Sequence, residues 1–377
     1  MTIRHLTVQP FQIAGSEWLG DPTSTPAVLQ PCNGADEIIE VGPALAFPGL
    51  INSHDHLEFN CYPPLGSPPY ADFTVWSREV QRDYQDLIAA VEGVPRAVRL
   101  KFGALKNLLW GVTAVAHHGT AIPSGVELPI KVIANFDAVH SPELDRHGRL
   151  EFLKAWRRRP IAAHVGEATT AESRQRALGF AHWNLFRRAL VGIHGVALQE
   201  PDFALFDALV WCPASNLNLL NATANVAAAK RCLTVLFGTD ATLSAPGTLW
   251  DHLRQARDVG GLSEEELFES LTAKAGRFWR MPESNGDLVV ARKRRPARWD
   301  AFYSITPADI LLVMIGGRPV LADETLVSAH PQMFGSLTKL SLPTGAKWVA
   351  LDTDNLTLEL RERLPSGDVS AMLGRIG

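Results

Sequence analysis

The spacing of apolar residues divides the chain into three parts. Residues 1–46 alternate in short apolar and polar steps interrupted by Gly, Pro and Asn, which is typical of strands joined by turns. Between residues 47 and 284, short apolar runs alternate with longer stretches of helical periodicity. Strand-like alternation returns from residue 285. We therefore expect an α/β unit over 47–284 and a composite β-sandwich domain made of 1–46 and 285–377.

The middle part predicts a parallel sheet covered by helices, because strands that are buried on both faces are apolar throughout. So many strand-helix repeats over about 230 residues favour a (β/α)₈ TIM-like barrel. A doubly wound sheet is the alternative, although no GxGxxG motif follows an early strand. The stretch from residue 119 to 160 is short for two strand-helix units, which leaves room for a distorted barrel at its third and fourth strands.

Composition and charge narrow the class of protein. The chain of 377 residues is 46% hydrophobic and 20% charged, as ordinary globular proteins are. Its net charge of −4 gives no electrostatic reason to expect nucleic acid or an anionic membrane as a partner. The N-terminal residues lack a secretory signal pattern, no run reaches the roughly 18 apolar residues of a membrane span, and the four cysteines form no CxxC pair. We expect a cytoplasmic protein, for which homo-oligomerisation is possible but not indicated by any pattern.

Side chains that can bind metal follow several of the apolar runs, at the position where barrel enzymes place their active sites. They are His54, His56, His164, Glu167, His194 and Asp240. A single histidine at a strand end is usually a hydrogen-bonding residue. Four at the same topological position, together with an aspartate, supply the nitrogen and oxygen ligands that zinc or a similar divalent ion prefers. Because no cysteine belongs to the set, an open catalytic site is favoured over a closed structural one.

Five motifs in a fixed order carry a resemblance to a known family. "PGLINSHDHLEF", "HVGEAT", "GIHG", "CPASNLNL" and "GTDATLS" resemble the metal-dependent amidohydrolase superfamily, in the branch of cytosine deaminase and chlorohydrolase-like enzymes. The resemblance covers roughly residues 1–325, and it implies the barrel fold with flanking β-structure. It implies four residues around the metal: His54, His56, His164 and Asp240. It further implies that His194 lies beside the water or substrate, that Glu167 moves protons, and that residues 212–216 pack near the substrate.

The chemistry of these residues agrees with a hydrolase. A divalent ion lowers the pKa of bound water from near 16 towards about 7, so that hydroxide is available to attack an electron-poor sp² carbon. Asp240 can hold the ion and accept the water's proton, Glu167 can pass a proton to the substrate, and His194 can stabilise the tetrahedral intermediate through a charge-assisted hydrogen bond. We expect one divalent ion, with zinc favoured and iron the alternative.

Glu167, three residues after His164, favours an aminohydrolase that releases ammonia from a small heterocyclic substrate. The alternatives are the opening of a cyclic amide or imidazolone, or the removal of another leaving group such as halide. A barrel that has lost catalysis and serves as a scaffold is a minor alternative, because the chain keeps every expected ligand. A single ion is expected, since Lys131 begins its strand and Lys154 lies in an expected helix, so neither lysine is placed to bridge two ions.

Further expectations concern substrate contacts, one structural residue and one loop. His118, His140 and Asn216 are expected to contact substrate, whereas Asp55 points away from its neighbouring histidines and is expected to be structural. The Pro- and aromatic-rich segment 62–76 is either a lid over the site or a packed surface loop. The segment from residue 337 onward is expected to add further strands, without a functional interpretation.

Overall fold

The computed structural model describes residues 5–8, 11–19, 37–141, 150, 152, 159–281 and 286–377. Three cysteines lie in these ranges, and Cys61, Cys212 and Cys232 are all free thiols. Lys154, which was expected in a helix, lies outside the described residues. No helix in the part of the chain that the structure describes is long and apolar enough to span a membrane.

The middle of the chain forms two parallel sheets. The first has three strands in the order β4-β5-β6, and the second has five in the order β11-β10-β9-β8-β7. Their bounds are β4 Leu50–Asp55, β5 Val112–His117, β6 Lys131–Ile133, β7 Asp137–Val139, β8 Ile161–Val165, β9 Leu190–His194, β10 Ala208–Trp211 and β11 Thr234–Phe237. β4, β5, β8, β9 and β10 are buried throughout, and apolar residues predominate in all of them but β4, which confirms the prediction of parallel strands covered by helices.

The two sheets meet at the carboxyl ends of β4 and β11. The backbone N–H groups of Thr239 and Asp240 both donate to the carbonyl oxygen of His54, each at 3.1 Å. On the other side β6 and β7 are edge strands of three residues each, and residues 134–136 join them without a helix. The described strands therefore form two sheets, not a closed barrel. The distortion lies at the third and fourth strands, where the chain was too short for two full units.

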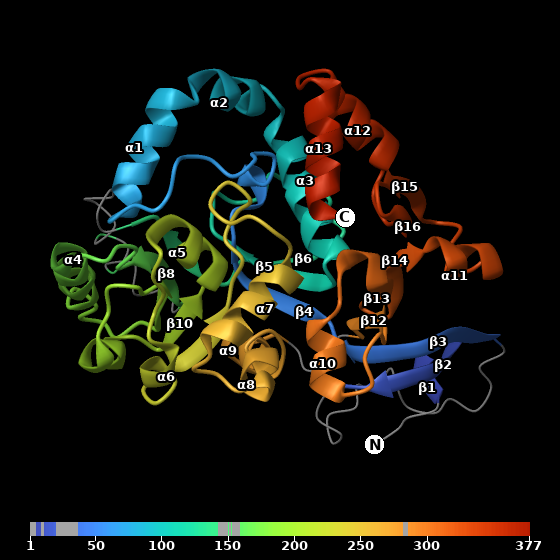
Figure 1. Ribbon diagram of the computed structural model, residues 1–377, viewed down its shortest axis with the longest axis horizontal. Helices are drawn as coiled ribbons and strands as arrows, with labels where there is room; N and C mark the ends of the chain where they lie inside the picture. The colour runs from blue at the N-terminus through green and yellow to red at the C-terminus, as the bar shows by residue number, and fades with distance from the viewer. Residues whose placement is uncertain are drawn as a thin grey trace.

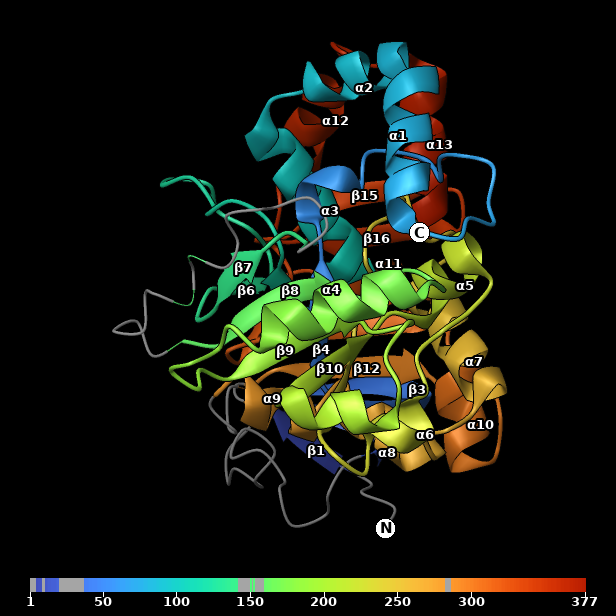
Figure 2. The same cartoon turned by 90° about the vertical axis from the view of Figure 1, so that its left-hand side faces the viewer.

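Helices cover the strands from outside, as α4 does for β8 in Figure 2. The helices of this middle unit are α1 Phe73–Asp83, α2 Gln85–Glu92, α3 Arg96–Leu109, α4 Ala171–Ala181, α5 Pro213–Leu220, α6 Val226–Ala229, α7 Leu249–Val259, α8 Glu264–Glu269 and α9 Ala273–Phe278, with 3₁₀ turns η2 Leu57–Phe59 and η5 Glu200–Leu205. Local sequence sets several of their ends. At α8, for example, Ser263 and Glu266 form a reciprocal capping box.

Both ends of the chain meet in one eight-stranded sheet, with the strand order β1-β2-β3-β12-β13-β14-β16-β15 (Figure 1). The strands are β1 His5–Val8, β2 Phe11–Trp18, β3 Glu37–Pro48, β12 Leu288–Arg292, β13 Ile310–Ile315, β14 Arg318–Asp323, β15 Thr338–Leu342 and β16 Gly345–Val349. The junction is the antiparallel pair β3–β12, in which Phe47 lies opposite Val289. The expected meeting of the two ends is thus present, while a sandwich of two facing sheets stays a prediction.

A single glycine carries the chain from this sheet into the parallel strands. β3 ends at Pro48 and β4 begins at Leu50. A Cβ atom on Gly49 would lie 2.3 Å from Thr113 Oγ1, so only glycine allows the first parallel strand to start this close to β5. Pro48 and Gly49 therefore mark the passage between the two units.

The end of the chain meets the expectation of further strands only in part, in β15 and β16. After β15 and β16 it forms the helices α12 Thr353–Arg361 and α13 Ser366–Ile376, while α10 Arg298–Tyr303, η6 Pro307–Asp309 and α11 Glu324–Ala329 lie between the earlier strands. The C-terminal helices pack beside α3, and Trp110 donates its indole N–H to the carbonyl of Ile376 at 2.9 Å (Figure 1). The expected domain boundaries remain a prediction.

Candidate active site

The carboxyl ends of the parallel strands bring the predicted metal-binding side chains together. His54 lies in β4 and His56 directly follows it, while His164 lies in β8 and His194 ends β9. Asp240 comes three residues after β11. Parallel strands present their carboxyl ends on one side of a sheet, which is why residues almost 190 positions apart can meet there.

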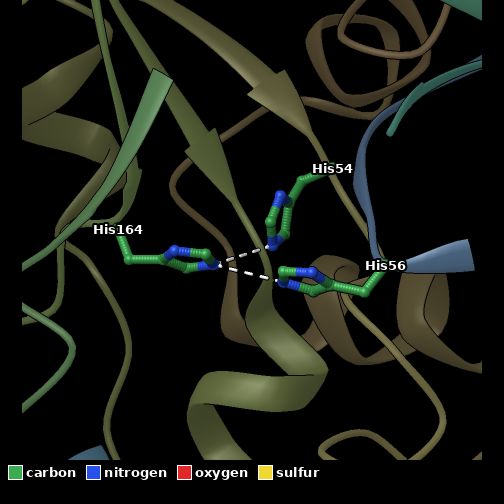
Figure 3. Close-up of side chains that lie close together, drawn as sticks. All are labelled: His54, His56 and His164. Atoms are coloured by element: carbon green, nitrogen blue, oxygen red, sulfur yellow. Dashed lines mark hydrogen bonds between the residues drawn. The ribbon is translucent and has the colours of Figure 1, made fainter. Parts of the chain in front are cut away.

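Three histidines point their Nε2 atoms at one another (Figure 3). Nε2 of His164 lies 3.2 Å from Nε2 of His54 and 3.3 Å from Nε2 of His56. Oδ1 of Asp240 lies 3.5 Å from Nε2 of His54 and 3.7 Å from Nε2 of His56. His54 and Asp240 also group with His194 as a second potential set of metal ligands.

These separations suit side chains that share one divalent ion. Two ligand atoms that are each bound at about 2.1 Å lie about 3.4 Å apart when the angle between them is tetrahedral. Nε2 of His164 has a lone pair available, since its Nδ1 donates to the carbonyl oxygen of His140 and leaves Nε2 unprotonated. Burial lowers the pKa of His164 well below its ordinary value and that of His56 to about 3, so both rings are neutral at physiological pH. The donor set therefore fits a metal ion.

Asp240 is held as a carboxylate by contacts that sequence reasoning missed. The hydroxyls of Ser215 and Ser244 both donate to its Oδ2 at 2.7 Å, which leaves Oδ1 directed at the histidines. Burial favours the neutral acid, but the hydrogen bond with His54 and the nearby histidines hold the pKa of Asp240 well below its usual range. The two serines occur in the motifs "CPASN" and "GTDATLS". The motifs therefore contained both residues, although their spacing did not show that they bind Asp240.

Close backbone approach and unusual torsions position two of these residues. Gly238 lets β11 reach β4, since a Cβ atom there would lie 2.8 Å from Cβ of His54. His194 and Asp240 both have positive φ angles, 71° and 56°. Non-glycine residues rarely adopt this left-handed conformation, and such strain is concentrated at functional sites.

His194 has a defined protonation state. Its Nδ1 lies 2.8 Å from Oδ1 of Asn216, and because an amide oxygen only accepts, Nδ1 carries the proton. Burial lowers the pKa of His194 to about 4, so Nε2 is unprotonated and faces Oε2 of Glu167 at 3.6 Å. The neutral ring has no Nε2 proton to donate. The charge-assisted hydrogen bond expected for His194 therefore requires a proton gained during the reaction.

The cluster forms the floor of a cavity of about 240 Å³. Its lining includes His56, His140, His164, Glu167, His194 and Asp240. Of the three residues expected to contact substrate, only His140 is on the cavity wall. Asn216 lies behind His194, and His118 is buried with Nε2 3.1 Å from the carbonyl of Val139. We infer that Asn216 positions His194 and that His118, whose ring packs against those of His54, His56 and His164, positions the proposed metal ligands.

Two expectations about nearby residues agree with the structure. Asp55 is fully buried away from the cavity and forms an ion pair with Lys106 at 2.8 Å, consistent with a structural role. Lys131 pairs with Asp287 at 2.7 Å at the opposite end of its strand, so it cannot bridge two metal ions.

The segment 62–76 packs against the structure at several points. The indole N–H of Trp76 donates to the carbonyl of Leu65 at 2.8 Å, and the Tyr70 hydroxyl donates to Glu79 Oε1 at 2.6 Å. These bonds favour the interpretation as a packed loop. Leu65 and Trp76 nevertheless line the cavity, so the segment forms part of its wall.

Comparison with known proteins identifies the fold. No family model and no curated protein sequence matches the chain. Among solved structures, the zinc-bound adenosine deaminase from Xanthomonas campestris is similar with a TM-score of 0.62 and 16% identity over 86% of each chain. The zinc complex of atrazine chlorohydrolase from Arthrobacter aurescens TC1 has a TM-score of 0.58 and 18% identity, covering 81% of this chain and 91% of that one.

Aminofutalosine deaminase from Helicobacter pylori is also similar, with a TM-score of 0.52 and 15% identity over 75% of this chain and 88% of that one. At such low identity, similarity of structure establishes the fold and leaves substrate and reaction open. This agrees with the motifs that placed the chain near this group of enzymes. The chain therefore has the fold of the metal-dependent amidohydrolases.

Proposed function

We propose that this protein is a metal-dependent aminohydrolase that replaces an exocyclic amino group of a small heterocycle with oxygen and releases ammonia. One observation carries the proposal: Glu167 lines the same cavity as His56, His164 and Asp240 and lies 3.6 Å from the unprotonated nitrogen of His194. A carboxylate beside a candidate metal site supplies the proton transfer that loss of ammonia requires.

The metal would be held by His54, His56, His164 and Asp240, with zinc the favoured ion. When bound, a divalent ion acts as a Lewis acid and makes hydroxide available near neutral pH. The adenosine deaminase and atrazine chlorohydrolase structures of similar fold contain zinc. The separations of 3.2–3.7 Å that link the four ligand atoms support one ion per chain.

The protein's own groups then account for the proton movements. Oδ1 of Asp240, the oxygen free of the two serines, can accept a proton from water. Glu167 can deliver a proton to a ring nitrogen or to the leaving amine. Nε2 of His194 can take up a proton and then donate a hydrogen bond to the oxygen of the intermediate. In the overall reaction, the water oxygen bonds to the sp² carbon, the exocyclic C–N bond breaks, and nitrogen leaves as ammonia.

The proposal predicts ammonia release in a screen of purines, pyrimidines, pterins and triazines with the zinc-loaded protein. At least one amino-substituted ring should be converted with a kcat/KM that is measurable above the background reaction. The Glu167→Gln variant of the same preparation is the control for contaminating activity. Ring opening of a lactam without ammonia from any amino compound would contradict deamination.

Replacing Glu167 with glutamine should reduce kcat by about 10²–10⁴, the usual contribution of a positioned general acid or base. The amide keeps the shape of the side chain but cannot carry the proton. Metal content, measured by mass spectrometry, should stay at the wild-type level because Glu167 is not among the four proposed ligands. Unchanged turnover, or loss of metal together with activity, would contradict the proposed role.

A second candidate keeps the site and changes the leaving group. Atrazine chlorohydrolase shares the fold, so loss of halide from an sp² carbon would use the same ligands and the same attack. Cytoplasmic location and homo-oligomerisation remain predictions.

A further inference from the structure

The cavity has an apolar wall above its polar floor. The wall comes mainly from α1 and α2, and its apolar residues include Leu65, Phe73, Trp76, Val80, Ile88 and Leu243. Ser77 and Gln81 of α1 also line it. Ligand sites use a few polar groups to fix orientation and apolar surface to supply affinity. A ligand whose reacting atom reaches Glu167 and Asp240 therefore places most of its remaining atoms against hydrocarbon.

The wall is tied to the catalytic floor by backbone hydrogen bonds. Phe73 N–H donates to the carbonyl of Glu167 at 3.2 Å, and Thr169 N–H donates to the carbonyl of Ala71 at 2.9 Å. The side chain of Asp72 caps the start of α1 by accepting from Thr74 N–H at 2.7 Å. The Leu65 carbonyl fixes the Trp76 indole in turn. The apolar wall thus has a set position relative to the proton-transferring residue.

The charges around the cavity disfavour ligands that carry an acidic group. Among the residues that the structure describes, the cavity lining contains three carboxylates, of Glu167 and Asp240 on the floor and Glu92 at the exposed rim, and neither Lys nor Arg. Within this described lining, a carboxylate or phosphate on the outer part of a substrate would lie near Glu92 and would find no cationic side chain to pair with. Burying an unpaired charge in this way disfavours binding.

The size of the cavity sets a further limit. Its volume of about 240 Å³ lies below the roughly 300–1,000 Å³ of sites for drug-sized ligands. A single ring with a short substituent is the size of ligand that this space matches.

We propose that the substrate is a neutral or weakly basic single-ring heterocycle that carries a compact apolar substituent and no acidic group. The apolar wall binds the substituent while the floor holds the reacting carbon. This inference rests on the proposed aminohydrolase function and adds the substrate class to it. It disfavours nucleotides and heterocycles with carboxylate side chains, including imidazolones that carry a propionate.

Two matched series test the proposal: 4-aminopyrimidine and 2-amino-1,3,5-triazine, each carrying hydrogen, methyl, propyl or 2-carboxyethyl. Dissociation constants come from quenching of tryptophan fluorescence, and ammonia release gives kcat/KM. Affinity should rise up to about fourfold for each buried methylene, so propyl should bind at least tenfold more tightly than hydrogen. The 2-carboxyethyl compound, which has the three-carbon chain of propyl with two carboxylate oxygens added, should bind at least tenfold more weakly than propyl.

Three variants test which residues cause these differences in affinity. Trp76→Ala should remove most of the propyl advantage, measured as the ratio of kcat/KM for the propyl compound to kcat/KM for the unsubstituted ring. Glu92→Gln should reduce the discrimination against 2-carboxyethyl several-fold. Trp183→Ala, which removes an exposed tryptophan on another part of the surface, should change neither ratio.

The outcomes separate this inference from the function on which it rests. Ammonia release from the unsubstituted rings, with equal affinity for hydrogen, propyl and 2-carboxyethyl, would overturn the substrate class and leave the aminohydrolase function standing. A propyl advantage that survives in Trp76→Ala, with the variant folded by circular dichroism, would also overturn it. Absence of ammonia from both series and from the broader screen would remove the function and the substrate class together.

Discussion

Replacing His56 with alanine is expected to remove the bound metal and the catalytic activity together. Nε2 of His56 lies 3.3 Å from Nε2 of His164 and 3.7 Å from Oδ1 of Asp240, so it is one corner of the proposed coordination site. Loss of an outer-shell partner of a ligand typically costs 10–100-fold in metal affinity, and loss of a ligand itself should cost more than about 100-fold. Mass spectrometry should find about one ion per chain in the wild type and almost none in the variant.

The matched control is His182→Ala, since His182 is exposed at the C-terminal end of α4 and takes no part in the cluster. That variant should keep both metal and turnover. Normal activity in a metal-free His56→Ala protein would refute the metal mechanism. Two ions per chain in the wild type would refute the single-ion site.

Breaking the buried ion pair behind the site is expected to destabilise the fold strongly. Nζ of Lys106 lies 2.8 Å from Oδ2 of Asp55, and these side chains are 1% and 0% exposed. Lys106→Met would leave the Asp55 carboxylate buried without a counter-charge. Removing one partner of such a pair costs about 3–5 kcal/mol of unfolding free energy, which urea denaturation would measure.

The double variant Lys106→Met/Asp55→Asn tests the cause. It removes both charges and keeps side chains of similar size, so it should recover a large part of the stability. The recovery should be incomplete, because Asp55 also accepts hydrogen bonds from the side-chain amides of Asn52, Asn60 and Asn107. A loss below about 1 kcal/mol in Lys106→Met would show that Asp55 is not an uncompensated charge there.

The C-terminal residues show how a sequence pattern can fit two structures. The segment "NLTLELRERL" alternates apolar and polar residues, as a strand would, but Leu356, Leu360 and Leu364 also follow the spacing of one helix face. The structure selects the helix: those three leucines are at most 4% exposed, whereas Leu358 is 56% exposed. Packing of α12 and α13 beside α3 decides between the two periods, and no local pattern contains that contact.

Turns and caps were predictable because their chemistry is local. Gly316 and Gly317 join β13 to β14 with φ angles of 59° and 77°, as a two-residue hairpin requires. The capping box at Ser263 is set within four residues in the same way. By contrast, the break between β6 and β7 depends on how two three-residue strands pair across the sheet, which involves distant segments.

The sequence by itself determined the parallel α/β core and the metal-binding residue types at the ends of its strands. The apolar runs and their periodicity involve only residues that are close together in the sequence. Only the tertiary structure decided which atoms meet. It joined Ser215 and Ser244 to Asp240, fixed the proton of His194 through Asn216, and set Lys106 against Asp55. It also placed an apolar wall over the site. These contacts join residues from separate elements, and their distances follow from the packing of the whole chain.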